Sequence, residues 1–201
     1  RKFQQQTLSD ADRLSLEIFV YDLEASIEGT AFPSHLMPIN QFYSMPSLMG
    51  VLGSGTSAQP FASVEDYERF LKRIDDYVVW SDQAIVNMRE GAKRGITYPR
   101  LLMEKLLPQL AELGTDDIEK SVFFDPIENL PDTISTQERA RLTVKYRTAI
   151  QQTIAPAYRR LHDYIRDEYL RDARTAVGWS ALPNGAQWYA YLARLSTTTG
   201  V

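Results

Sequence analysis

The residue types that most often bind metals or act as acid–base catalysts are scarce in this sequence. It contains two histidines, His35 and His162, and no cysteine. A zinc site on a helix needs two histidines one turn apart, with further ligands nearby, so that the imidazoles converge on one face. Neither histidine has such a partner within a helical turn. The sequence therefore predicts no metal site built from this chain alone, and each histidine is interpreted as an ordinary polar residue.

Patterns for nucleophilic or acid–base chemistry are also incomplete. Gly53-Ser54-Gly55 lacks the strand and helix that flank a nucleophile elbow, and no Lys-Ser or Lys-Thr follows it as in a phosphate loop. The acidic pairs Asp75-Asp76 and Asp116-Asp117 are expected on a polar helix face and at a helix start. Arginines between 159 and 174 alternate with acidic residues, which favours ion pairs along a helix. No catalytic residue is predicted.

The composition excludes several classes of protein. The 201 residues include 22 Lys+Arg and 26 Asp+Glu, for a formal net charge of −4, and 44% are hydrophobic. This balance is typical of a globular protein. It does not favour nucleic-acid binding, because neutralising phosphates requires clustered Lys and Arg. No apolar run reaches the roughly 18 residues of a membrane span. The lack of cysteine does not identify a cellular compartment.

The elements that must position any functional residue are predicted to be helices. Apolar residues recur at three- and four-residue spacing, and Ser9, Ser63 and Ser135 are typical helix caps. We expect the first helix to be well buried, because two adjacent apolar rows run along it. Pro156 should kink the longest helix, and Pro108 should kink or break another. The predicted helices begin near Ser9, Ser63, Thr97, Ser135 and Gly185 and end near Gly29, Gly91, Leu113, Gly178 and Leu195.

Two stretches interrupt this helical pattern. Residues 30–59 and 121–133 are rich in proline and glycine, yet they also carry many apolar side chains. Such segments are expected to lie across the helices or to line a site. Strand patterns are weak and no long repeat occurs. The sequence therefore predicts an all-α fold, a bundle of long kinked helices with long Pro- and Gly-rich irregular loops, as a single helical region over residues 1–201.

Several short segments resemble, in their order and spacing, the N-terminal part of the DUF885 family of bacterial proteins. The most specific is Leu182-Pro183-Asn184-Gly185, followed by Tyr189 and Thr197-Thr198-Thr199. The resemblance covers nearly the whole chain. The other segments are Pro38-Ile39-Asn40-Gln41, Arg89-Glu90-Gly91, Gly95-Ile96, Tyr98-Pro99-Arg100, Ile154-Ala155-Pro156-Ala157-Tyr158, Tyr169-Leu170 and Gly178.

This resemblance implies a larger protein of the zinc metallopeptidase type. The family is mostly helical, resembles gluzincin peptidases, and is often exported or lipid-anchored, which implies a periplasmic or cell-envelope location. Its zinc motif, His-Glu-x-x-x-x-His-His-like with a downstream Glu, lies C-terminal to the Thr-Thr segment, whereas this chain ends at Gly200-Val201. The implied function is the N-terminal helical portion of a zinc-dependent peptidase-like hydrolase. This portion is inactive alone and holds no cofactor, and zinc is implied for the longer parent.

The partners implied are the remainder of the parent chain and a peptide substrate. We expect helices that pack on the remainder to leave an exposed apolar surface here. Asn40 and Gln41, with Asn184 and Tyr189, are predicted to line or support a substrate cleft, because their polar groups lie in apolar, Pro- and Gly-bounded segments. In the alternative, the amides bond the backbone of their own loops. The alternative function is a non-enzymatic helical protein-binding module of the cell envelope.

Overall fold

The computed structural model describes residues 8–197, which contain helices and no β-strand, so the predicted all-α class is confirmed. The chain divides into two compact units, His35–Val177 and the pair Arg1–Ser34 with Gly178–Val201. Each unit is described by itself below, and the single helical region over 1–201 stays a prediction. Thr198 and Thr199 lie outside the described residues. No helix within 8–197 combines the length and apolarity needed to cross a membrane.

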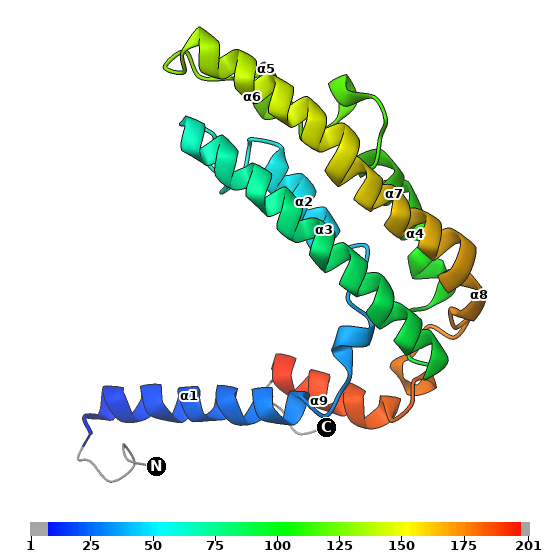
Figure 1. Ribbon diagram of the computed structural model, residues 1–201. Coiled ribbons are helices and arrows are strands. Elements are labelled where there is room, and N and C mark those ends of the chain that lie inside the picture. The colour runs from blue at the N-terminus through cyan, green and yellow to red at the C-terminus, as the bar shows by residue number, and fades with distance from the viewer. Residues whose placement is uncertain (1–7, 198–201) are drawn as a thin grey trace. The chain divides into compact units, whose positions relative to one another are not determined.

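The unit His35–Val177 contains two long helical runs that lie side by side (Figure 1). One is a single helix, and the other is continuous from Thr136 to Asp172 because two π-helical segments, Ile150–Ile154 and Ile165–Tyr169, join its α-helices. The α-helices of this unit are α2 (Met45–Gly53), α3 (Val64–Lys93), α4 (Arg100–Leu113), α5 (Asp125–Glu128), α6 (Thr136–Ala149), α7 (Ala155–Tyr164) and α8 (Leu170–Asp172).

The two long runs are parallel. Their cross-helix ion pairs include Glu68 with Arg141, Asp82 with Arg160 and Arg89 with Glu168, and the separations along the sequence are 73, 78 and 79 residues. A nearly constant separation means that both helices advance in the same direction, as their colours show in Figure 1. Helix α4 packs on α7 and covers another side of the same run. The core lies between these three elements.

Buried tyrosines tie this core together. The Tyr146 hydroxyl donates to the carbonyl oxygen of Tyr67 at 3.0 Å, and the Tyr67 hydroxyl donates to the carbonyl oxygen of Pro126 at 2.9 Å. The Tyr158 hydroxyl donates to the carbonyl oxygen of Pro46 at 2.8 Å. Burial raises the pKa of Tyr67 to about 12, so its hydroxyl keeps the proton that it donates. Each bond gives a buried tyrosine hydroxyl its partner.

Prolines lie inside helices of this structure, and the kinks expected at Pro156 and Pro108 stay predictions. At Pro156 the long run widens into a π-helical segment, where the Ala155 N–H donates to the carbonyl of Ile150. This widening accommodates a residue that lacks an N–H and crowds the preceding turn. Helix α4 continues through Pro108 without a break. Pro46 lies in the first turn of α2, where a proline is favourable, so the expected irregular stretch 30–59 contains a helix.

The other unit pairs α1 (Asp10–Gly29) with α9 (Gly185–Thr197). The Tyr191 hydroxyl donates to the carbonyl oxygen of Ala25 at 3.0 Å, and Arg194 forms an ion pair with Glu28. The Phe32 ring stacks on Trp188, with centroids 5.6 Å apart. These contacts all involve the C-terminal end of α1 and the segment that follows it.

The expected burial of α1 is wrong. None of its residues is buried, and Leu14, Ile18 and Ile27 are 58%, 55% and 69% exposed. The two apolar rows do form a helix, but among the described residues of this unit α9 contacts the last turns alone and leaves the rest of each row exposed. Apolar side chains are thus exposed along α1, while an apolar surface that packs on a longer protein stays a prediction.

The core contact between the two long runs can be tested at Ile154, which is fully buried in the run beside α3. We expect Ile154→Ala to lower the free energy of unfolding by about 2–5 kcal/mol, because the substitution leaves a cavity in a packed core. The control is Val144→Ala, since Val144 is 65% exposed on α6. Urea denaturation measures both. Equal losses from the two substitutions would contradict the described packing.

The N-terminus of α3 predicts a specific acid sensitivity. Asp66 accepts the backbone N–H of Ser63 at 2.9 Å and that of Ala62 at 3.1 Å, and it is paired with Arg69. Hydrogen bonds from Arg69 and then Ser63 lower the pKa of Asp66 from 3.8 to about 2. A carboxyl group whose pKa is lower in the folded state than in the unfolded state stabilises the protein at pH values above the unfolded-state pKa. This stabilisation is lost as the pH falls through the folded-state pKa.

We therefore expect the melting temperature of the protein to exceed that of Asp66→Asn at pH 6, with the gap closing between about pH 4 and pH 2. Thermal unfolding of both proteins across this range, followed by circular dichroism, measures the effect. A gap that is constant with pH would show that the carboxylate charge does not contribute.

Candidate functional site

The segment from Leu36 to Tyr43, named here the Asn40 turn, begins on a buried base. Leu36 and Ile39 are 2% and 0% exposed. The Tyr98 hydroxyl donates to the carbonyl oxygen of Met37 at 3.0 Å. The Leu36 backbone passes so close to α3 at Gly91 that a Cβ on this glycine would lie 2.9 Å from the Leu36 carbonyl oxygen. The segment is therefore fixed to the scaffold before it turns outward.

The side chain of Asn40 builds the turn itself. Its Oδ1 accepts the backbone N–H groups of Phe42 and Tyr43, both at 2.8 Å. Its Nδ2 donates to the carbonyl oxygen of Tyr43 at 2.9 Å. Asparagine commonly replaces backbone bonds in this way in turns. The amide of Asn40 thus bonds its own loop, which is the alternative that the sequence left open.

The Asn40 turn presents two aromatic rings. Phe42 and Tyr43 are 74% and 90% exposed, although the residues before them are buried. Rigid aromatic side chains on a braced turn offer a large contact area at a low entropic cost of ordering. Sequence analysis did not select these two residues. The signal was available, because two aromatic residues directly follow a turn-forming asparagine.

Gln41 differs from its neighbour Asn40 in how its amide is used. Its Oε1 is buried and has no hydrogen-bond partner among the described residues. A buried acceptor without a donor costs free energy. Of the two adjacent amides, Gln41 is the one whose oxygen lacks a donor among the described residues, and a ligand N–H reaches this oxygen only when the side chain turns outward.

The other two predicted cleft residues belong to the unit that contains α9. Asn184 adopts a left-handed backbone conformation with φ 54°, and its carbonyl oxygen accepts the Trp188 N–H at 3.0 Å in the first turn of α9. Asparagine tolerates this conformation better than most residues. Tyr189 is 57% exposed. Because Asn40 and Gln41 lie in the other unit, a cleft shared by all four residues stays a prediction.

The charged residues of α3 and the neighbouring run line an open groove of about 540 Å³. At its centre Arg89 donates to Glu168 through Nε at 3.0 Å and through Nη2 at 2.8 Å, and its guanidinium lies 4.9 Å from the Tyr164 ring centroid. The hydrogen bonds from Arg89 hold the pKa of Glu168 below its ordinary value. A carboxylate stabilised in this way stays deprotonated near neutral pH and is a weak base, so we interpret the groove as a structural contact.

The residues present do not fit a zinc site. Within residues 8–197, no group of three or more His, Cys, Asp or Glu side chains could hold a metal ion. The Nδ1 of His162 lies 3.0 Å from Oδ1 of the adjacent Asp163. We therefore derive no step of a reaction through a metal held by these residues.

The fold and the Asn40 turn define an all-α protein that carries an anchored, aromatic-tipped loop on a pair of parallel long helices. The chain belongs to the DUF885 family, described as a bacterial protein of unknown function, whose model matches residues 1–201. Comparison with curated proteins and with solved structures gave no match.

The two amides of the Asn40 turn should respond oppositely to substitution. We expect Asn40→Ala to destabilise the protein by about 1–3 kcal/mol, because two backbone N–H groups lose their acceptor. Gln41→Met should leave stability unchanged or raise it, because an apolar chain of similar length replaces an unsatisfied buried oxygen. Urea denaturation measures both. A larger loss for Gln41→Met than for Asn40→Ala would contradict these assignments.

Proposed function

We propose that this chain is the N-terminal helical portion of a zinc-dependent peptidase-like hydrolase and that it contributes substrate binding. Family membership over residues 1–201 supports this proposal in general terms. The observation that carries it is the Asn40 turn, where an unpartnered Gln41 acceptor lies next to two exposed aromatic rings. When bound elsewhere in the longer protein, zinc would supply a metal-activated water for hydrolysis.

The chemistry of the turn suits an extended peptide. A peptide backbone carries an N–H at every residue except proline, and one of these can donate to Oε1 of Gln41 when a rotation of the side chain brings this buried oxygen to the surface. Phe42 and Tyr43 then offer apolar contact to the neighbouring side chains of the peptide. Asn40 contributes indirectly, because its three hydrogen bonds hold the backbone on which these groups sit.

The exposed row of α1 supports a second part of the proposal. A helix with Leu14, Ile18 and Ile27 exposed gains free energy when another surface covers it. We assign this cover to the remainder of the longer protein, which we place in the periplasm or cell envelope.

A non-enzymatic helical binding module of the cell envelope is the second candidate. The same exposed rings of Phe42 and Tyr43 favour it, because large aromatic residues are enriched where proteins bind one another. Metal analysis distinguishes the two candidates. Stoichiometric zinc together with peptide hydrolysis in the longer protein supports the hydrolase. Absence of both zinc and hydrolysis supports the binding module.

Gln41→Met in the longer protein tests the role of the turn. We expect KM for a peptide substrate to rise by about fivefold to tenfold with kcat unchanged, since the lost hydrogen bond of about 1 kcal/mol acts in binding alone. The matched control is Gln83→Met, because Gln83 lies exposed on α3 and bonds Asn87. An unchanged KM in an active enzyme would remove Gln41 from the substrate site.

A further inference from the structure

A second surface of the unit His35–Val177 has the form of a helix-binding groove. It lies between α2 and α3 and has a volume of about 380 Å³. From α2 it is lined by Met45, Leu48, Met49 and Leu52, a spacing of three, four and seven residues from the first. This spacing places all four side chains on one face of the helix. The groove therefore has an apolar wall two turns long.

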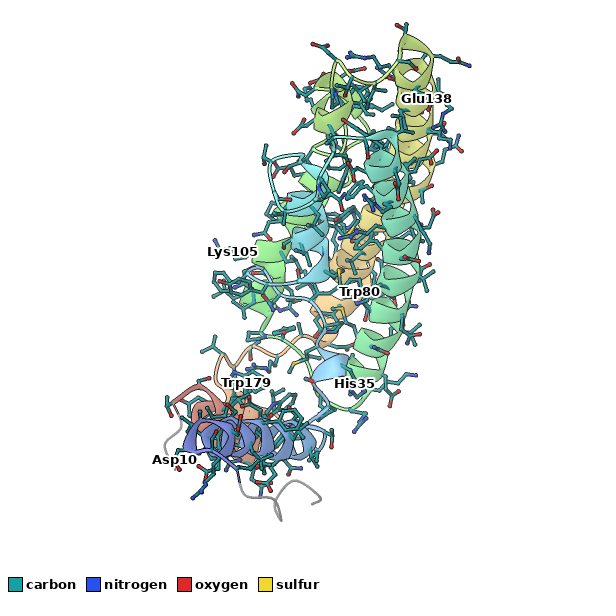
Figure 2. All side chains as sticks on the ribbon, turned by 90° about the vertical axis from the view of Figure 1, so that its left-hand side faces the viewer. Asp10, His35, Trp80, Lys105, Glu138 and Trp179 are labelled. Carbon is teal, nitrogen blue, oxygen red and sulfur yellow. The ribbon has the colours of Figure 1, made fainter. Side chains whose placement is uncertain are left out.

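Helix α3 supplies the opposite wall with the same spacing. Its lining residues are Arg73, Asp76, Tyr77 and Trp80, and Trp80 lies midway along the helix (Figure 2). Tyr77 and Met49 are buried at 2% and 1% exposure and form the floor. Met45 and Leu48 are 37% and 47% exposed at the rim. The floor is thus closed, while the apolar rim is left uncovered by the described residues of the unit His35–Val177.

Two ridges of this kind favour one type of occupant. Side chains at three- and four-residue spacing on two neighbouring helices leave a groove into which the ridge of a third helix packs. Peptides that bind such grooves carry apolar anchors at positions i, i+3, i+4 and i+7. Methionine suits this role, because its flexible side chain adapts to the anchor that it contacts.

The charge at the rim specifies the occupant further. Arg73 is exposed and forms no ion pair among residues 8–197. Asp76 lies one turn further along α3. Its Oδ2 is 4.0 Å from Nζ of Lys72, so its charge already has a partner. The uncompensated charge of the groove is positive, and an acidic residue beside the apolar anchors would complement it.

We propose that the α2–α3 groove binds an amphipathic helix of a partner protein that carries apolar residues at i, i+3, i+4 and i+7 and an acidic residue on the flank beside Arg73. This proposal does not depend on the proposed function, because the groove shares no residue with the Asn40 turn.

The probe is a fluorescein-labelled, stapled helical peptide with leucines at these four positions and glutamates along one flank. A second peptide has lysines in place of the glutamates. Fluorescence anisotropy of each peptide, titrated with the whole chain, measures affinity. We expect saturable binding of the glutamate peptide, weakened about tenfold or more by Leu48→Glu, because this places a charge at the apolar rim. Val51→Glu is the control, since Val51 is 56% exposed on α2 and does not line the groove.

Charge reversal gives the decisive comparison. We expect Arg73→Glu to weaken the glutamate peptide and strengthen the lysine peptide, whereas Arg69→Glu on the preceding turn of α3 leaves this preference unchanged. Absence of saturable binding, equal effects of Leu48→Glu and Val51→Glu, or an unaltered preference in Arg73→Glu would each overturn the proposal. Concentration-dependent dimerisation abolished by Leu48→Glu would also overturn it, by making a second copy the occupant.

Discussion

The parallel packing of α3 on the run from Thr136 to Asp172 is the constraint on which the unit His35–Val177 depends. Two parallel helices cannot be joined by a short turn, so the chain between them must cross back, and α4 and α5 lie in that connection. The Tyr67 hydroxyl bonds the carbonyl of Pro126 in this connection, and the Tyr146 hydroxyl bonds the carbonyl of Tyr67 on α3. The ion pairs between the two runs lie outside this core, where solvent screens them. They therefore contribute little to stability, and their main effect is on the alignment of the two runs.

This scaffold explains why a short loop can serve as a binding element. The base of the Asn40 turn is buried against α3, and Gly91 allows its backbone to approach the helix directly. Asn40 then uses both its amide oxygen and its amide nitrogen to shape the turn. What remains for a ligand is the pair of exposed rings, together with the Gln41 acceptor once its side chain turns outward. Rigid support beneath a small exposed tip is the usual arrangement of binding loops.

Helix periodicity and capping residues predicted most of the fold, because both are local. Ser9, Ser63 and Ser135 cap α1, α3 and α6 as the sequence indicates. The sequence does not predict helix α2, because the proline and glycine residues of the stretch 30–59 interrupt the helical pattern. Pro46 in fact occupies the first turn, and at Gly53 a Cβ would clash with the ring of Phe123. The exposure of α1 and the unpartnered oxygen of Gln41 depend on tertiary contacts between distant segments. Local sequence patterns do not encode these contacts.

The central claim is that the tip of the Asn40 turn contacts a peptide substrate. Photo-crosslinking tests it most directly, with a benzophenone amino acid replacing Phe42 in the longer protein and a labelled substrate peptide present during irradiation. The account predicts a crosslink to the peptide from position 42 and none from position 79, where the equally accessible Val79 lies on α3. Equal labelling from both positions, or none from position 42 in a protein that still turns over the peptide, would contradict it.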